Sequence, residues 1–285
     1  MSNPIMSIIC GGNRPHSWSA LIDALKVQQT PYEIVMVGPN PPVAWVPEYF
    51  HYHYSNVKPH QAQVAAAVLA QGRLLCYFND DWVIKQPNAL GQLVDEWDKC
   101  GDEEAIVAPH MSNSYPYLSF ATDKAGPILP FGDVFSRENF LKRGGWDTRF
   151  IGIYASNDRA IEMQQKGKPV KICYNIVLDE VSVGSLWDEL WQHDRSYLAW
   201  LWMEGYELTT PRERDFDVPL RPIRKVRRVA STPYDLTRDD LLYVHQGPKG
   251  KWRDSCKNCW ELHKICDHVP PPAVDPDIAT ALAMA

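Results

Sequence analysis

Short apolar runs alternate with segments of helical periodicity over the first 180 residues. Compact apolar runs predict buried strands, and apolar residues three or four positions apart predict helices. Strands are expected at residues 5–10, 32–38, 73–78, 105–110 and 169–175. Helices are expected at residues 17–29, 60–72, 87–97, 136–145 and 157–168. This alternation indicates an α/β fold with a mostly parallel sheet flanked by helices.

Local signals mark the ends of several helices. Ser17 is expected to cap the helix that follows it, because a serine side chain there can accept a backbone N–H bond, and Ser136 is expected to begin the helix at 136–145. Gly72, Gly145 and Gly167 follow helical segments. Glycine readily adopts the left-handed conformation that ends a helix, so we expect helix ends at these three residues.

The chain changes character near residue 210. A Trp-rich helix is expected at residues 186–206, and Pro, Arg and Asp prevail beyond Thr209. We therefore expect an α/β domain at 1–209 and a basic, helical or irregular C-terminal appendage at 210–285.

Charge follows the same division, although the net charge of the whole chain is −6. Residues 1–210 carry 16 Lys and Arg against 24 Asp and Glu, and residues 211–285 carry 13 against 11. The segment RPIRKVRRVA at 221–230 is strongly basic. It either meets the phosphates of a nucleic acid or a membrane surface, or is a solvated linker that pairs with the acidic body.

The composition is that of an ordinary globular protein, with 45% hydrophobic and 22% charged residues. No apolar run approaches the length of a transmembrane helix, and residues 1–10 lack the pattern of a secretory signal. The seven cysteines are scattered and odd in number. We therefore expect a cytoplasmic protein (in the host cytoplasm if it is viral) without disulfides or a membrane span.

The first candidate chemistry lies in the segment CYFNDDWVIKQP, where an apolar strand runs into Asn79, Asp80 and Asp81. Adjacent carboxylates repel each other, so they either lie in a harmless turn or hold a positive group. The first expected strand ends in GGNR at residues 11–14, and the second ends at Gly38. Ligands of parallel sheets bind outside the carboxyl ends of the strands. The three strand ends are therefore expected to form one pocket.

Four segments, in order along the chain, match the parts of one known family. SIICGGNRPHSWSALIDAL is similar to its first strand, Asn-Arg-Pro turn and helix, and PYEIVMVG to its second strand. AAAVLAQGRLLCYFNDDWVI resembles its helix, Ala-x-Gly, strand and Asp-x-Asp unit. GDVFSRENFLKRGGWDTRFIGIYASNDRAIEMQQKG resembles its acceptor-side signature. Over residues 5 to about 180 the chain thus resembles the nucleotide-sugar glycosyltransferases of the GT-A fold, family 2-like, which implies a Rossmann-like mixed sheet.

The resemblance implies a donor site for a nucleotide sugar, with a UDP-sugar as the expected donor. Asp81 is expected to bind Mn²⁺ or Mg²⁺ directly, with Asp80 or Asn79 assisting through ribose or water. A hard divalent cation with oxygen ligands neutralises the leaving diphosphate. The other expected donor-site residues lie at the first strand end and are Gly11, Asn13 and Arg14. For Arg14, a surface salt bridge is the alternative.

The resemblance also implies an acceptor site. Asp158 matches the general base that takes the proton of the attacking hydroxyl, or it is a first-turn acid that stabilises the helix dipole. Trp146 is expected to stack on a sugar, unless it is a core residue, and Asp147 to accept sugar hydroxyls. Gly145 belongs to the turn under the sugars, and Asn157 stands where the family usually has Glu.

Two departures from the family pattern limit these expectations. The family often has an Asp after the second strand, where this chain has Val37-Gly38-Pro39, so the nucleotide base stays open. The family sometimes offers a His after the acceptor-site helix as a further metal ligand, and residues 176–186 contain none. His193 lies seven residues further on and is either that ligand or a packed or surface histidine.

The appendage carries a Cys/His cluster in SCKNCWELHKICDH, with members Cys256, Cys259, His263, Cys266 and His268. The Cys-x-x-Cys step is typical of one half of a structural zinc site. On a continuous helix Cys256 and Cys266 would lie about 15 Å apart, so zinc requires a break in that helix. The alternatives are an apolar stripe that docks the tail on the main domain, and a redox pair.

Together these features predict a metal-dependent glycosyltransferase that moves a sugar to a hydroxyl group with inversion. The expected acceptor is a bacterial or viral glycan, or a hydroxymethylated base in DNA as in phage DNA-modifying glycosyltransferases. The alternatives are a catalytically inactive nucleotide-sugar-binding module, favoured by Asn157 and the missing second-strand Asp, and a nucleotidyltransferase.

Overall fold

The computed structural model describes most of the chain up to Val181. The described residues are 3–38, 40, 42, 46–54, 59–112, 128–143, 145–147, 150, 152, 154–181, 194 and 198. The expected helix at 186–206 lies outside them except for two single positions. The boundary near 210, the basic segment and the Cys/His cluster also lie outside the described residues, so they stay predictions.

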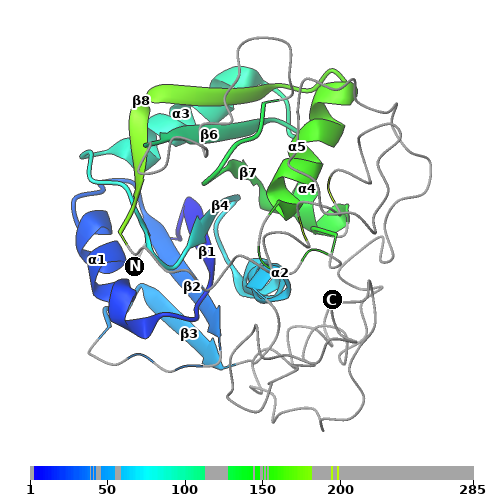
Figure 1. Cartoon of the computed structure of the whole chain (residues 1–285). Coiled ribbons are helices and arrows are strands. Elements are labelled where there is room, and N and C mark those ends of the chain that lie inside the picture. The colour runs from blue at the N-terminus through cyan, green and yellow to red at the C-terminus, as the bar shows by residue number, and fades with distance from the viewer. Residues whose placement is uncertain are drawn as a thin grey trace, which may run out of the picture.

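Eight strands form a mixed sheet in the order β3-β2-β1-β4-β7-β6-β8-β5 (Figure 1). They are β1 (Met6–Gly11), β2 (Tyr32–Gly38), β3 (Phe50–Tyr54), β4 (Leu74–Asn79), β5 (Trp82–Val83), β6 (Ile106–Met111), β7 (Val134–Ser136) and β8 (Val170–Glu180). β1 to β4 pair in parallel, as do β6 and β8, whereas β5 and β7 run antiparallel to their neighbours. The expected mixed, mostly parallel sheet is confirmed.

Helices cover both faces of this sheet. They are α1 (Trp18–Leu25) after the 3-10 turn η1 (Pro15–Ser17), α2 (Pro59–Leu69), α3 (Ala89–Cys100), α4 (Arg137–Lys142) and α5 (Ala155–Gln165). Figure 1 shows α1 and α3 on one side of the sheet and α2, α4 and α5 on the other. Because β1 is covered on both faces, its residues from Met6 to Cys10 are all buried, which explains why they are apolar except for Ser7, whose hydroxyl donates to Glu33 at 2.5 Å.

The register of β1 brings two candidate segments to one edge. Gly11 lies opposite Val37 on β2 and opposite Asn79 on β4. The residues that follow these strands therefore leave the sheet side by side. This is the edge at which the sequence predicts a ligand.

The structure confirms some of the predicted helix ends and not others. Ser136 caps α4, since its Oγ accepts a hydrogen bond from Asn139 N at 3.3 Å. Ser17 does not cap α1, because it lies in η1 with helical backbone angles and makes no side-chain capping bond. Gly72 does not end α2, which stops before it. A Cβ at Gly72 would lie 2.7 Å from Ser7 N, so close packing rather than a helix end requires glycine there.

β8 contains an irregularity where it pairs with β6. Pro109 lies opposite Cys173, but the next residue, His110, lies opposite Val177. β8 thus advances by four residues while β6 advances by one. The strand then regains its pairing and runs on to Glu180, beyond the predicted strand end.

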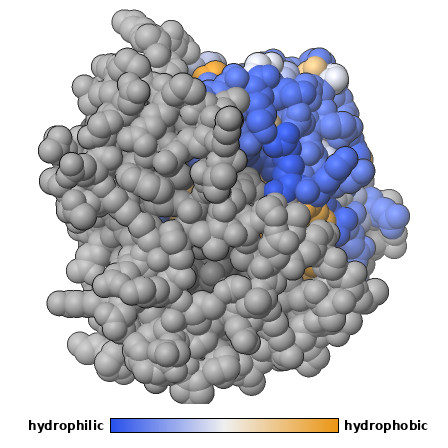
Figure 2. Space-filling view, turned by 90° about the vertical axis from the view of Figure 1, so that its right-hand side faces the viewer, coloured by the Kyte–Doolittle hydropathy of each residue, from blue (hydrophilic) through white to orange (hydrophobic). Residues whose placement is uncertain are grey.

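The side of the molecule that carries α4 and α5 is largely hydrophilic where it is described (Figure 2). Near the C-terminal end of α5, Lys166 pairs with Glu162, and Lys168 pairs with Asp102 and Glu104. None of the described helices combines the length and the apolar character needed to cross a membrane.

Candidate active site

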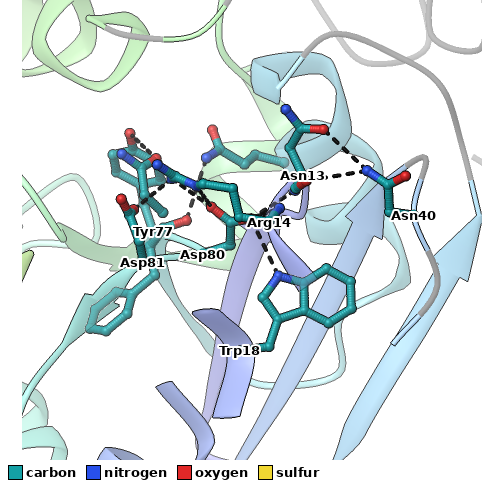
Figure 3. Close-up of polar contacts among 10 residues, drawn as sticks. Asn13, Arg14, Trp18, Asn40, Tyr77, Asp80 and Asp81 are labelled. Atoms are coloured by element: carbon teal, nitrogen blue, oxygen red, sulfur yellow. Dashed lines mark hydrogen bonds and ion pairs between the residues drawn. The ribbon is translucent and has the colours of Figure 1, made fainter. Parts of the chain in front are cut away.

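Asp80 is bound on both carboxylate oxygens by the segment that follows β1. Its Oδ2 accepts hydrogen bonds from Asn13 N at 2.7 Å, Arg14 N at 2.6 Å and Trp18 Nε1 at 3.3 Å (Figure 3). Its Oδ1 accepts from Arg14 Nε at 2.9 Å and Arg14 Nη2 at 2.6 Å. Protein donors therefore occupy this carboxylate, which anchors the loop after β1 to the end of β4.

Arg14 bridges the two adjacent acids. Its Nη2 lies 2.6 Å from Asp80 Oδ1 and 2.6 Å from Asp81 Oδ1. Burial by itself lowers the pKa of Arg14, but the charges of Asp80 and Asp81 outweigh burial and raise that pKa above its ordinary value. The guanidinium is thus the positive group that the neighbouring carboxylates hold in this structure.

A third carboxylate, which the sequence does not predict as a site residue, joins these two. Glu180 ends β8 and pairs with Trp82 of β5, while Val181 N donates to Asp81 O at 2.9 Å. Burial, followed by the charge of Asp81, raises the pKa of Glu180 to about 7, although Arg14 opposes the shift. We call Asp80, Asp81, Glu180 and Arg14 the acid cluster.

The acid cluster contains the type of ligand that a hard divalent cation prefers, although its three carboxylates do not form a metal site without further ligands. Asp80 and Asp81 share one guanidinium, and burial, followed by the charge of Asp81, raises the pKa of the neighbouring Glu180. Mg²⁺ and Mn²⁺ prefer such oxygen ligands and complete their shells with phosphate and water. Asp81 and Glu180 are the carboxylates that would hold the ion, because protein donors occupy Asp80. Within the described residues, no group of three or more His, Cys, Asp or Glu side chains could hold a metal ion by itself.

Asp158 lies in the first turn of α5 and is buried. Contacts from two other segments fix the start of this helix. His60 Nε2 accepts a hydrogen bond from Ala155 N at 3.4 Å, and His60 Nδ1 lies 2.7 Å from Gln63 Oε1. The amide of Asn157 donates to Pro130 O at 2.7 Å. Tyr154, the residue before α5, makes no side-chain capping bond. His60 of α2 therefore accepts the backbone N–H bond that a capping residue would otherwise accept.

A chain of ring contacts connects the end of β4 with the start of α5. Tyr77 donates a hydrogen bond to Asn79 Oδ1 at 3.1 Å, and its ring lies 6.1 Å from the ring of His60. The ring of Trp146 lies 5.1 Å from Tyr77 and 5.3 Å from His60. These contacts connect Asn79 and Trp146, through Tyr77 and His60, with the start of α5.

The turn before α5 is part of the core. Trp146 is 1% exposed and also packs against Phe135 and Phe140. It is therefore a core residue in this structure and does not offer an open ring face to a sugar. Gly145 has a φ of 65°, a conformation that favours glycine. Asp147 is buried as well.

The departure at the end of β2 has a steric cause. A Cβ at Gly38 would lie 1.7 Å from Gly12 O, and Gly12 N donates to Val37 O at 2.8 Å. An Asp at Gly38 is therefore excluded by the backbone of the neighbouring strand. Asn40 reaches this edge instead, because its Nδ2 donates to Asn13 O at 3.2 Å.

Gly11 also serves close packing, since a Cβ there would lie 2.8 Å from Pro59 O at the start of α2. His193 lies outside the described residues, as does Gly144.

The architecture is that of the GT-A fold, and the solved structures that resemble it are GT-A glycosyltransferases. GalNAc-T7, solved with UDP, GalNAc and Mn²⁺, matches with a TM-score of 0.54 and 12% identity over 72% of this chain and 49% of that chain. Mannosyltransferase PcManGT from Pyrobaculum calidifontis, in complex with GDP-Man and Mn²⁺, matches with a TM-score of 0.52 and 17% identity. The match covers 69% of this chain and 62% of that chain. S. aureus TarS matches with a TM-score of 0.51 and 10% identity, over 68% of this chain and 39% of that chain.

These likenesses establish the fold of this chain. The chain spans about half of the GalNAc-T7 structure and less than two thirds of the other two. No protein-family model matches the sequence. No curated protein matches it either.

Proposed function

We propose that the chain is a metal-dependent glycosyltransferase that moves a sugar from a nucleotide sugar, expected to be a UDP-sugar, to a hydroxyl group with inversion. The observation that carries this proposal is the acid cluster at the carboxyl-terminal edge of a GT-A sheet. Two solved structures of the same fold contain Mn²⁺ together with UDP or GDP-Man, which supports this class of donor.

On the donor side, Asp81 and Glu180 would hold Mn²⁺ or Mg²⁺, and the ion supplies positive charge to the leaving diphosphate. Arg14 would donate to diphosphate oxygens, because a guanidinium matches phosphate geometry. Asp80 fixes the loop of Asn13 and Arg14, through which the backbone would approach the nucleotide. Asn79, oriented by Tyr77, would meet the ribose.

On the acceptor side, Asp158 would take the proton of the attacking hydroxyl. Asp147 would accept hydroxyl groups of the sugar. Trp146 and Asn157 would act by holding these acids in place, since Trp146 packs among aromatic rings and Asn157 anchors α5. Gly145 permits the turn that joins them.

The test is release of nucleoside diphosphate from a panel of nucleotide sugars in the presence of Mn²⁺. We expect turnover of one donor, lowered about 100-fold or more by Asp81→Asn and by Asp158→Asn. Asp98→Asn is the matched control, because Asp98 forms an exposed pair with Arg73. Binding without release over the whole panel would instead support an inactive binding module. Release of pyrophosphate from a nucleoside triphosphate would indicate a nucleotidyltransferase.

The acceptor is proposed to be a glycan or a hydroxymethylated base in DNA. The DNA alternative depends on the basic segment 221–230, which lies outside the described residues. Transfer of labelled sugar to hydroxymethylated DNA, compared with unmodified DNA and with glycans, separates the two. A gel shift with DNA that disappears as salt rises would support phosphate contacts by the basic segment.

A further inference from the structure

The acid cluster contains its own cation at the position where the proposed function needs another one. Arg14 is buried and holds Asp81 Oδ1 at 2.6 Å through Nη2. Asp81 itself has no exposed surface. The carboxylate proposed as the direct metal ligand is therefore neutralised by a protein side chain in this structure.

A guanidinium and a divalent ion compete for such an oxygen. Both are positive, and Mg²⁺ binds carboxylate oxygens at about 2.0–2.1 Å. Two cations on one oxygen in a buried site repel each other strongly, because the dielectric constant is lower there than in water. Binding of the ion through Asp81 Oδ1 therefore requires Arg14 Nη2 to leave that oxygen.

Arg14 can release Asp81 without leaving the site. Its Nε and Nη2 both bind Asp80, and its backbone N–H also binds Asp80. Only the contact with Asp81 has to break. After it leaves Asp81, the Arg14 guanidinium could bind the diphosphate of the donor instead, since guanidinium N–H groups pair well with phosphate oxygens.

We propose that Arg14 is a displaceable counter-ion that weakens divalent metal binding to Asp81 in the free protein and moves to the diphosphate of the donor. This inference rests on the proposed function. Because the same guanidinium opposes the metal and favours the diphosphate, nucleotide and metal strengthen each other's binding. Such coupling is reciprocal and typically amounts to about 5–150-fold in affinity.

The decisive measurement is Mn²⁺ binding by calorimetry without nucleotide. We expect Arg14→Gln to bind Mn²⁺ about tenfold more tightly than the wild type, because the competing charge is gone. Arg73→Gln is the matched control, since Arg73 pairs with Asp98 on the exposed surface. It should leave Mn²⁺ affinity unchanged.

A second measurement adds UDP or GDP without sugar. The nucleoside diphosphate should strengthen Mn²⁺ binding of the wild type by a larger factor than that of Arg14→Gln. Arg14→Lys keeps the charge but loses the two-nitrogen contact with Asp80 that places Nη2 between both acids, so we expect an intermediate Mn²⁺ affinity. If Arg14→Gln is too unstable to purify, the lysine variant and the nucleotide dependence of the wild type provide the test.

Arg14→Gln and Arg14→Lys that bind Mn²⁺ no more tightly than the wild type without nucleotide would overturn the inference. The proposed function would stand if the wild type still hydrolysed a nucleotide sugar with Mn²⁺. Absence of Mn²⁺ binding in every variant, with and without nucleotide, would overturn both.

Discussion

Burial raises the pKa of one carboxyl group that lies within the core, Asp133. Asp133, directly before β7, has no exposed surface. Burial raises its pKa to about 7, although the charge of Arg159 opposes the shift. The guanidinium carbon of Arg159 lies 4.9 Å from the centre of the Phe135 ring, so Arg159 also makes a cation–π contact with the aromatic core.

We therefore expect Asp133→Asn to change the pH dependence of stability. The pKa of Asp133 is higher in the folded state than its ordinary value of 3.8, so the folded protein keeps a proton that the unfolded chain releases. Stability from this group is present below pH 4 and is lost as pH rises to about 7. The asparagine variant should gain about 2–4 kcal/mol over the wild type across this window.

Urea unfolding at several pH values measures this difference. Asp95→Asn, at an exposed position of α3, is the control and should leave the shape of the curve unchanged. Parallel curves for the wild type and Asp133→Asn between pH 4 and pH 7 would contradict the expectation.

The residue scale also marks a limit of the sequence. Adjacent acids at 80 and 81 predict a positive partner, and the structure contains one in Arg14. The donors that bind Asp80 come from a loop 66 residues earlier in the chain. The local sequence around Asp80 and Asp81 therefore cannot predict which of the two acids these donors bind. Glu180 escapes prediction for a related reason, because its partner Asp81 becomes a neighbour only through the pairing of β5 with β8.

At the scale of elements, the close approach of β1 and β2 fixes their carboxyl ends. A Cβ at Gly38 would overlap Gly12 O, and Gly12 N donates a hydrogen bond to Val37 O. The parallel pairing of these strands thus continues one residue past β1. The position of the nucleotide loop depends on this contact.

Gly38→Ala should therefore destabilise the protein by about 3 kcal/mol or more, because the new Cβ would overlap Gly12 O. Gly167→Ala is the matched control. Gly167 has a φ of 71° but open space around a Cβ, so its cost should be about 1 kcal/mol from backbone strain alone. Thermal unfolding of both variants measures the difference, and equal losses would show that the close approach carries no energy.

Long, uniformly apolar strands and the helices between them are the elements that the sequence predicts. The missed strands are short or mixed in character. β5 has two residues and β7 three, and β3 reads FHYHY with exposed His51. Such segments form strands because neighbouring strands offer them hydrogen bonds, and this information is absent from local periodicity.

At the scale of the whole molecule, the acid cluster draws on the ends of β1, β4 and β8, which only the complete sheet brings together. Arg14 balances part of its charge within the chain. We therefore expect the described fold to be stable without a bound ion, whereas the proposed reaction requires one.

Removal of metal should separate these two properties. Treatment with EDTA should abolish release of nucleoside diphosphate, and added Mn²⁺ should restore it. The melting temperature should stay the same, as measured by differential scanning calorimetry. A lower melting temperature after EDTA would point to a structural ion, such as zinc at the Cys/His cluster of the appendage.

The uneven pairing of β6 and β8 has a consequence for how this edge is built. Between Cys173 and Val177, β8 gains three residues over its neighbour. The surplus is taken up locally, because His110 and Met111 of β6 pair with Val177 and Leu178 directly after it. Such an irregularity bends a strand and increases its twist. It therefore influences the direction in which β8 continues toward Glu180, the residue that pairs with Trp82 next to Asp81.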